Sequence, residues 1–427
     1  MNAYRLFPAL RIPHLALGFA ALTACSSAPS PEASQEKLAR AESAVISGKA
    51  SDKTQDDVVL LIHYDPTQQA VASCTGTLLS DRVVLTARHC VADTDESAAC
   101  DIMGNPIAQG VVRGNHPANT LYVFIGQNRP DFSSPNITPD GIGAQVLDDG
   151  GKNLCNHDIA MVILKDPIPN AKIAQLRLDS PIKVGEMITA VGWGVTDTTP
   201  EPNTRQQRTG IAVQSSGPDD TQQLPVAPNE FEVGESICSG DSGGPAFAKS
   251  GAIIGIVSRG GNATKPDPQN PASGCIGAEN LYTKVAPFKQ FIVNGLKMVD
   301  ADPWLEGGPD PRLLKPDAAC TDATQCRSNL CLANPAMNSM LTCAQDCSDG
   351  SACPDGTVCT TEASNMVCRA PAAAPGSGNG AASGGAKTIT TSGCAIGSAG
   401  GNGSNGALGL VLAAAFGLVA MRRRRAV

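Results

Sequence analysis

Aromatic residues are scarce in this chain of 427 residues, where Phe, Trp and Tyr together make up only 4%. Apolar residues nevertheless reach 42%, which is enough to build a core, while 44 glycines and 31 prolines indicate many turns. This profile favours an all-β domain with loosely structured segments over a helical bundle. The length is too great for one small module and indicates two or three structural units.

Acidic residues are absent from residues 1–25 and 395–427, where Arg5, Arg11 and Arg422 to Arg425 lie. The formal net charge of the whole chain is −8. Without those arginines it is about −14, so the central part of the protein is acidic. An acidic protein does not bind nucleic acid through bulk charge, and we expect no nucleic-acid partner.

The apolar run near the N-terminus, Leu15 to Leu22, is too short for a stable transmembrane helix. With the arginines before it and the small residues after it, the run predicts a secretory signal peptide over residues 1–25. The segment Leu22-Thr23-Ala24-Cys25 resembles the lipobox of bacterial lipoproteins, which implies lipidation of Cys25. The alternative is an ordinary signal peptide with an incidental cysteine. We assign residues 26–44 to a propeptide.

The C-terminal region has the composition of a flexible linker, followed by an apolar run, Ala407 to Met421, and four arginines. Together with Ser392-Gly393-Cys394, this arrangement resembles the MYXO-CTERM sorting signal of myxobacteria. The resemblance implies processing near Cys394 by the export and sorting machinery and a membrane tether at the cell surface. The alternative is a simple tail anchor with its arginines in the cytoplasm. We expect a linker over residues 369–393 and the sorting signal over residues 394–427.

Short apolar runs bounded by turn residues recur about every ten positions between Val45 and Val299. Runs of this length, rich in Val and Ile, predict β-strands, and many strands with long loops predict a sandwich or barrel. The clearest runs are residues 58–62, 83–86, 159–164 and 253–257. Residues 287–296 form an amphipathic stretch that predicts a terminal helix. Residues 300–319 are rich in Pro, Gly and Asp and predict a linker.

Sixteen cysteines are too many for reduced cytosolic thiols and indicate an oxidising compartment. Eight of them fall between Cys320 and Cys368, in a segment with too few apolar residues to fold on a core. We therefore predict a small module over residues 320–368 held by four disulfides, whose connectivity the sequence leaves open. Zinc binding is the alternative, but the segment has no histidine and export disfavours it.

The most informative motif is Gly240-Asp241-Ser242-Gly243-Gly244-Pro245. A serine hydroxyl is a poor nucleophile unless a base takes its proton and hydrogen-bond donors stabilise the oxyanion. Upstream, His89 ends a predicted strand beside a cysteine, and Asp158 begins another predicted strand. Each residue alone could be structural, but the ordered set contains the three residue types that nucleophilic catalysis by serine requires.

These segments resemble the motifs of the trypsin/chymotrypsin serine proteases at residues 86–90, 158–160 and 240–245, and residues 191–194 and 281–285 match in the same order. The resemblance covers residues 45–299 and implies two six-stranded antiparallel β-barrels with a C-terminal helix. It implies that Ser242 attacks the scissile carbonyl of a protein or peptide substrate, that His89 is the general base, and that Asp158 orients His89. The N–H groups of Gly240 and Ser242 would form the oxyanion hole, and no metal or cofactor is required.

The same resemblance implies disulfides that join Cys74 to Cys90 and Cys238 to Cys275. The two cysteines left over in this region, Cys100 and Cys155, could pair with each other.

The resemblance also implies a zymogen. Val45-Ile46-Ser47-Gly48 is similar to the N-terminus that family members acquire by cleavage, and its amine would pair with Asp241 and order the oxyanion hole. A buried carboxylate at Asp241 needs such a cation. Ala44 stands where a basic residue often precedes the cut, so we expect an activating protease other than the protein itself.

The resemblance places Ser236, Gly260 and Asn280 in the specificity pocket. Because Ser236 is neutral, we do not expect selection for Arg or Lys. Gly260 would leave the pocket mouth open while Ile237 and Asn280 narrow it, which favours uncharged side chains of small or medium size. A shift of one residue would instead bring Glu279 into the pocket. Arg259 replaces an aromatic residue common in the family, so the subsites beyond the pocket are open.

We therefore expect an exported, surface-tethered serine endopeptidase. One alternative is a non-catalytic binding protein of the same fold, in which the Cys-rich module recognises the partner. Another is an esterase or lipase. The order His, Asp, Ser disfavours it, because α/β-hydrolases place Ser first, in a Gly-x-Ser-x-Gly turn that residues 240–244 do not form.

Overall fold

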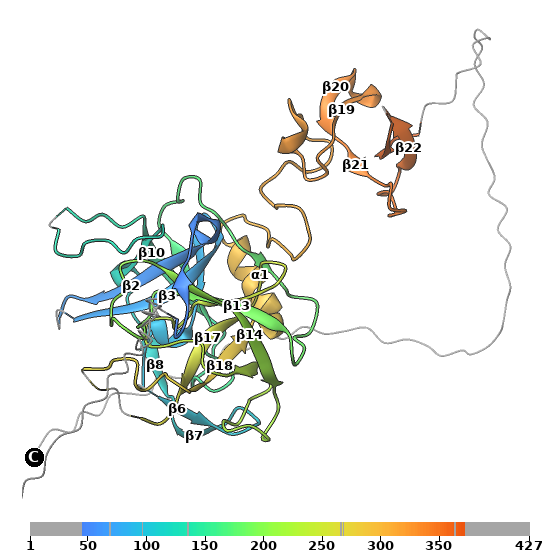
Figure 1. The fold of residues 1–427 in the computed structure, drawn as a ribbon. Coiled ribbons are helices and arrows are strands. Elements are labelled where there is room, and N and C mark those ends of the chain that lie inside the picture. Colours follow the sequence, from blue (N-terminus) through green and yellow to red (C-terminus); the bar gives the residue numbers. More distant parts are fainter. Residues whose placement is uncertain are drawn as a thin grey trace, which may run out of the picture. The chain divides into compact units, whose positions relative to one another are not determined.

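The computed structural model describes residues 45–371, except residues 68–69, 96, 135, 265–266, 268 and 363 (Figure 1). The predicted signal peptide, propeptide and sorting signal lie outside the described residues, as do Cys25 and Cys394. Within the described part of the chain, we find no helix with the length and apolar character needed to cross a bilayer.

The first half of the protease region is a closed six-stranded barrel in the order β10-β11-β4-β3-β2-β9, with antiparallel neighbours throughout. Its strands are β2 (Val58–Asp65), β3 (Ala70–Ser80), β4 (Val83–Thr86), β9 (Leu121–Phe124), β10 (Gly141–Asp148) and β11 (Ala160–Leu164). Every residue of β4 and β11 is buried, so these two apolar runs pack on both of their faces. The predicted strand over residues 83–86 coincides with β4.

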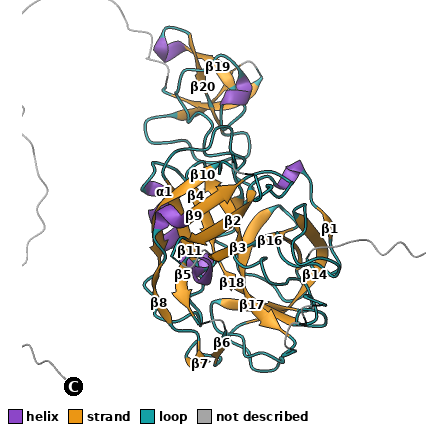
Figure 2. Ribbon diagram, turned by 90° about the vertical axis from the view of Figure 1, so that its left-hand side faces the viewer, coloured by secondary structure: helices purple, strands orange, loops and turns teal. Residues whose placement is uncertain are grey.

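The second half closes in the same way, because β14 pairs with β15 at the ends of the order β14-β13-β16-β17-β18-β15. Figure 2 labels β14, β16, β17 and β18 of this barrel. Its strands are β13 (Met187–Gly192), β14 (Gln206–Ser216), β15 (Glu230–Val233), β16 (Pro245–Ala248), β17 (Ala252–Gly261) and β18 (Glu279–Lys284). Two short strands, β1 (Lys49–Ala50) and β12 (Gln175–Leu176), pair with β14 and β17. The predicted fold class, two six-stranded antiparallel barrels with a C-terminal helix and a disulfide-rich module, is confirmed.

One hydrophobic cluster joins the two barrels. It contains Leu85 and Ile159 from the first barrel and Phe247 and Ile256 from the second. The helix α1 (Lys289–Lys297) adds its buried residues to this cluster, which explains the apolar face of the predicted helix. A 3₁₀ turn, η4 (Ala286–Phe288), precedes α1, so the α-helix begins two residues later than predicted.

Two small antiparallel strand pairs lie in the segment between β4 and β9 of the first barrel, the second of them a hairpin. The first pairs β5 (Ala92–Thr94) with β8 (Val112–Asn115), and the second pairs β6 (Ala98–Cys100) with β7 (Pro106–Gln109). A disulfide joins Cys100 of the second hairpin to Cys155. This bond fixes the hairpin to the loop that leads to Asp158.

The Cys-rich module contains five short strands: β19 (Cys331–Asn334), β20 (Met340–Cys343), β21 (Gln345–Asp346), β22 (Val358–Glu362) and β23 (Asn365–Arg369). Four disulfides hold it, joining Cys320 to Cys331, Cys326 to Cys343, Cys347 to Cys359 and Cys353 to Cys368. The predicted number of disulfides is therefore confirmed, and the connectivity is now defined. With these sulfurs paired, the cysteines are not thiolate ligands for zinc.

Part of the predicted linker is bonded to the second barrel. Leu176 donates its N–H to the carbonyl of Trp304 at 2.7 Å and accepts the N–H of Glu306 at 3.0 Å. The Glu306 carboxylate also takes two hydrogen bonds from Arg177, at 2.6 and 2.8 Å. We call residues 304–306 the strap. Its composition predicts a linker, but its backbone and one carboxylate find partners on the barrel.

Candidate active site

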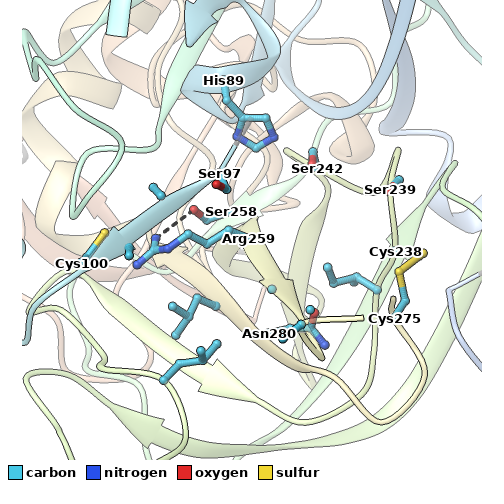
Figure 3. Close-up of a pocket in the computed structure, with 18 of the residues that line it drawn as sticks. His89, Ser97, Cys100, Cys238, Ser239, Ser242, Ser258, Arg259, Cys275 and Asn280 are labelled. Atoms are coloured by element: carbon cyan, nitrogen blue, oxygen red, sulfur yellow. Dashed lines mark hydrogen bonds between the residues drawn. A yellow bond between two sulfur atoms is a disulfide. The ribbon is translucent and has the colours of Figure 1, made fainter. Parts of the chain in front are cut away.

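A pocket of about 480 Å³ is lined by residues from both barrels (Figure 3). His89 enters it from the loop after β4, and Ser242 from the loop before β16. Strands β17 and β18 supply Arg259, Gly260 and Asn280. The fold therefore brings His89 and Ser242, which are far apart in the sequence, to one cavity.

His89 lies in a single 3₁₀ turn, η2 (Arg88–Cys90), directly after β4. The disulfide between Cys90 and Cys74 fastens this turn to β3. The His89 ring nitrogen Nδ1 lies 2.9 Å from Asp158 Oδ2, and the His89 backbone N–H donates to Asp158 Oδ1 at 3.1 Å. These two contacts fix both the turn and the imidazole against one carboxylate.

Asp158 is almost fully buried, with 1% of its surface exposed. Burial alone would raise the Asp158 pKa. The charge of His89, the hydrogen bonds from His89 and the hydrogen bond from Ser258 together outweigh burial and lower that pKa. Ser258 Oγ donates to Asp158 Oδ2 at 2.6 Å. Burial likewise opposes the charge of His89, and Asp158 outweighs that effect and raises the His89 pKa. The pair therefore favours an anionic Asp158 facing a histidine that accepts protons readily.

The Ser242 loop is held by Thr75 of β3. Thr75 donates its N–H to the Ser242 carbonyl at 2.8 Å and its hydroxyl to the Gly240 carbonyl at 2.9 Å. Gly240 has a φ of 99° and Gly243 a φ of 78°, a region that disfavours side chains. A Cβ at Gly243 would also lie 2.1 Å from Thr86 Oγ1. Both glycines are thus required by the backbone path that presents Ser242.

The backbone N–H groups of Gly240 and Ser242 have no acceptor among the described residues. Free amides beside a serine hydroxyl are the donors that an oxyanion would need. Over the same residues, no hydrogen bond joins Ser242 Oγ to His89. Ser242 and His89 line one pocket, whereas only His89 and Asp158 are directly bonded.

The predicted specificity residues occupy different depths. Gly260 and Asn280 line the pocket, but Ser236 does not. Ser236 is fully buried, with its hydroxyl 3.3 Å from the hydroxyl of Tyr282. Asn280 Nδ2 donates to the Gly234 carbonyl at 3.0 Å, and a Cβ at Gly260 would lie 2.2 Å from Asn280 Oδ1. The Asn280 amide thus occupies the space beside Gly260, within the pocket wall.

Glu279 does not line the pocket. It neighbours Asn280 on β18, and adjacent residues of a strand point to opposite faces. Its Oε2 is buried without a hydrogen-bond partner among the described residues, 3.9 Å from where a Cβ on Gly234 would lie. The possibility that a register shift places this carboxylate in the pocket is therefore wrong.

Arg259 forms an ion pair that the sequence did not predict. Its guanidinium binds both oxygens of Glu230, from Nη1 at 2.7 Å and from Nη2 at 2.9 Å. The Glu230 side chain is fully buried, while Arg259 lines the pocket. The replacement of an aromatic residue by Arg259 was the available signal. Its partner lies 29 positions away on β15, and no local pattern connects the two.

Asp241 is also fully buried and lies behind the serine loop. It accepts the N–H of Gly194 at 2.8 Å and the N–H of Cys238 at 2.9 Å. Burial outweighs these two bonds and raises the Asp241 pKa to about 7. No basic side chain of the described residues pairs with it. Val45 is fully buried in the core of the second barrel and has a φ of 51°.

Three disulfides surround the pocket. They join Cys74 to Cys90, Cys238 to Cys275 and Cys100 to Cys155, which are the expected pairings. Four of these cysteines belong to segments that carry or line the site: Cys90 follows His89, and Cys100, Cys238 and Cys275 line the pocket. The bonds therefore brace the loops of the site.

The two closed barrels and the pocket between His89 and Ser242 define the chymotrypsin-like fold class. An α/β-hydrolase is excluded, because the six strands that close each barrel all pair antiparallel with their neighbours, whereas that fold is built on a mostly parallel sheet. The family model described as Trypsin matches residues 45–292, more than half of the chain. The protein therefore belongs to the trypsin family of serine proteases.

Individual relatives are distant. Phenoloxidase-activating factor 3 of Holotrichia diomphalia is 26% identical over 287 residues, covering 60% of this chain and 73% of its own. Snake venom serine proteinase 14 of Crotalus adamanteus is 28% identical over 261 residues, covering 58% and 85%. Chymotrypsin-2 of Vespa crabro is 26% identical over 237 residues, covering 54% and 92%. These matches cover the protease region and support a serine protease that acts on protein or peptide substrates.

Proposed function

We propose that the protein is a serine endopeptidase in which Ser242 is the nucleophile, His89 the general base and Asp158 the residue that orients His89. The supporting observation is the 2.9 Å contact between His89 Nδ1 and Asp158 Oδ2 at a pocket that Ser242 also lines. With Nδ1 engaged, His89 Nε2 takes the Ser242 proton as the hydroxyl attacks the carbonyl carbon. The proton then passes to the leaving amine, and water releases the acyl group by the reverse sequence.

The N–H groups of Gly240 and Ser242 stabilise the oxyanion of each tetrahedral intermediate in this proposal. Because the base must be neutral, kcat/KM falls as the pH drops through the pKa of His89. Asp158 raises that pKa, so it shifts the loss of activity to higher pH than an isolated histidine would give.

The pocket favours uncharged side chains of small or medium size. Ile237 and Asn280 line it, and Ser236 lies buried outside its lining, so no carboxylate faces a basic substrate side chain from these positions. The expected order of kcat/KM for peptides that differ only at the residue before the scissile bond is Ala, Val or Leu above Lys or Arg. A preference for Lys or Arg would contradict this specificity.

We further propose that the enzyme is made as a zymogen and is activated by another protease that cuts before Val45. Val45 is buried, and the buried Asp241 has no cation among the described residues, so a new ammonium group at Val45 would supply the missing charge. Export by a signal peptide and tethering through Cys25 or through processing at Cys394 belong to this proposal and rest on the sequence alone.

The test is to label the protein from cells with a serine-reactive fluorophosphonate, and then to determine the mass and N-terminus of the labelled species. We expect label on a chain that begins at Val45, none in Ser242→Ala, and full labelling in Ser239→Ala, which alters another serine of the same pocket. Labelling of a chain that still begins at Cys25 contradicts activation at Val45. A chain that begins at Val45 and takes no label supports the non-catalytic binding protein instead.

A further inference from the structure

A continuous line of hydrogen bonds connects Glu230 to the His89–Asp158 pair. Glu230 holds the Arg259 guanidinium by two bonds, and Arg259 Nη1 donates to Ser258 Oγ at 3.4 Å (Figure 3). Ser258 then donates to Asp158 Oδ2 at 2.6 Å, and the same oxygen lies 2.9 Å from His89 Nδ1. The donor directions agree along the whole line, because Ser258 accepts from Arg259 while its own proton goes to Asp158.

Glu230 also fixes the backbone on the other side of Asp158. Its Oε1 accepts the N–H of Asn156 at 3.1 Å, two residues before Asp158, and its Oε2 lies 3.3 Å from the N–H of Ala227. Asn156 has a φ of 68°, in the left-handed region that asparagine tolerates, and the bond to Glu230 fixes the backbone at this turn. One buried carboxylate therefore holds both the loop before Asp158 and the guanidinium that touches Ser258.

The charge of Glu230 is compensated inside the protein. Its carboxylate is fully buried, and a charge in that position requires a partner and hydrogen bonds. Arg259 supplies both, with the two amides in addition. Lys284 and His157 are the other charged or titratable groups whose charges interact with Glu230. Lys284 is engaged with the carbonyls of Gly217 and Pro228.

We propose that Arg259, held by Glu230, is a positioning residue of the active site that acts on Asp158 through Ser258 and presents a fixed positive charge to His89. This proposal rests on the proposed function. The charged groups that act on His89 are Asp158 and Arg259, with opposite signs. Arg259 opposes protonation of His89 and keeps the base available at lower pH than Asp158 alone would allow, which supports the geometric argument.

The experiment measures the rate of fluorophosphonate labelling of the activated full chain as a function of pH, for the parent and for Arg259→Gln, Arg259→Lys and Glu230→Gln. The small probe does not depend on the binding of a peptide. The fall of the labelling rate at low pH, which we call the acid limb of the profile, therefore reports the pKa of the base His89. Arg113→Gln is the matched control, since Arg113 is an exposed, ion-paired arginine that does not line the pocket.

We expect Arg259→Gln to move the acid limb to higher pH and to slow labelling by roughly 10- to 100-fold, because the Asp158 contact loosens. Arg259→Lys should keep the limb at the parent position but lower the labelling rate, since lysine keeps the positive charge but cannot form the bidentate contact with Glu230. Glu230→Gln should move the limb to lower pH, because the charge of Arg259 is then uncompensated. A purely structural role would lower the rate without moving the limb in opposite directions.

An acid limb that stays at the parent position in both Arg259→Gln and Glu230→Gln overturns this proposal. Failure of the parent to label at Ser242 would overturn the proposed function instead, so the two failures are distinguishable. If Arg259→Gln does not fold, the double variant Arg259→Gln with Glu230→Gln replaces the ion pair by two amides. Because only the Arg259 charge separates it from Glu230→Gln, its limb should lie at higher pH than that of Glu230→Gln, and equal limbs in these two variants contradict the proposal.

Discussion

The barrels and the Cys-rich module are stabilised by different means. The barrels enclose large clusters of Val, Leu, Ile and Phe, and strands such as β4 and β11 are buried throughout. The module's cluster consists of three buried cysteines, while Met340, Leu341 and Met366 are exposed. Its order depends on cross-links that restrict the unfolded chain rather than on apolar burial.

Disulfides have a different use in the barrels. There the bonds from Cys90, Cys100 and Cys238 brace loops around the pocket, and the apolar clusters are far larger than the cluster of the module. The comparison teaches that a cross-link can replace a core in a small unit and can fix a site in a large one. Substitutions in one region can test whether the barrels and the module are stabilised independently of each other.

The largest expected effect is that of Leu85→Ala in the barrels. Leu85 is fully buried in the cluster shared by both barrels, so its truncation leaves a cavity and should cost about 2–5 kcal/mol in the free energy of unfolding. Denaturant unfolding measures the loss, and hydrogen exchange should show the module's segments unchanged. Val184→Ala, at an exposed position, is the control. Equal loss of protection in the module would contradict independent stabilisation.

A second substitution removes a cross-link from the module. Cys326→Ser combined with Cys343→Ser opens a bond with a sequence separation of 17 residues, and should cost about 3 kcal/mol. Because the module has little apolar core, we expect residues 320–343 to lose protection from hydrogen exchange while the fluorophosphonate labelling rate stays at its parent value. Met340→Ala, an exposed position in the same hairpin, should retain protection. If Cys326→Ser with Cys343→Ser keeps its protection from hydrogen exchange, apolar packing alone is enough to order the module.

The smallest expected effect concerns Glu232 in the second barrel, which is fully buried without a well-formed hydrogen bond to its carboxyl oxygens from the described residues. Burial and then the charge of Glu279 raise the Glu232 pKa to about 7, above the ordinary value of 4.5. Between pH 4.5 and about 7 the folded state binds more protons at Glu232 than the unfolded state does. The free energy of unfolding therefore falls as the pH rises through this range.

Glu232→Gln should therefore stabilise the protein at pH 8 by roughly 1–2 kcal/mol and have little effect near pH 4.5. Thermal unfolding at several pH values measures the difference, with Glu201→Gln, at an exposed position, as the control. A variant that is less stable than the parent at pH 8 would mean that the Glu232 carboxylate has a stabilising partner.

The sequence predicted those features that depend on local pattern. Residues 83–86 are a short apolar run of the kind that turn residues bound, and they form β4 as expected. The glycines around Ser242 indicate a tightly turned loop. The module's connectivity was not predictable, because cysteine spacing does not say which sulfurs meet in space. Glu230 and Arg259 were missed as a pair for the same reason: β15 and β17 come close only because both pair with β18 in the second barrel.

The strap illustrates the limits of composition. Pro, Gly and Asp around residues 304–306 predict a connection without partners, yet Leu176 and Arg177 bind two of these residues. The signal was the pair Trp304 and Leu305 within a polar stretch, and the partner strand lies more than a hundred positions earlier. Non-local hydrogen bonds of this kind leave no local periodicity to detect.

The strap also determines how the protein meets mechanical load. Any pull on the chain beyond residue 371 passes through the module, whose disulfides limit its extension. Before it reaches α1 it meets Arg312, which donates to the Ala171 carbonyl at 2.7 Å, and then residues 304–306. The Arg312 hydrogen bond, the two backbone hydrogen bonds of Leu176 and the contact between Arg177 and Glu306 therefore bear that load before α1 does. Tension on the C-terminal part of the chain must break these contacts before it can pull on α1, which packs in the cluster shared by both barrels.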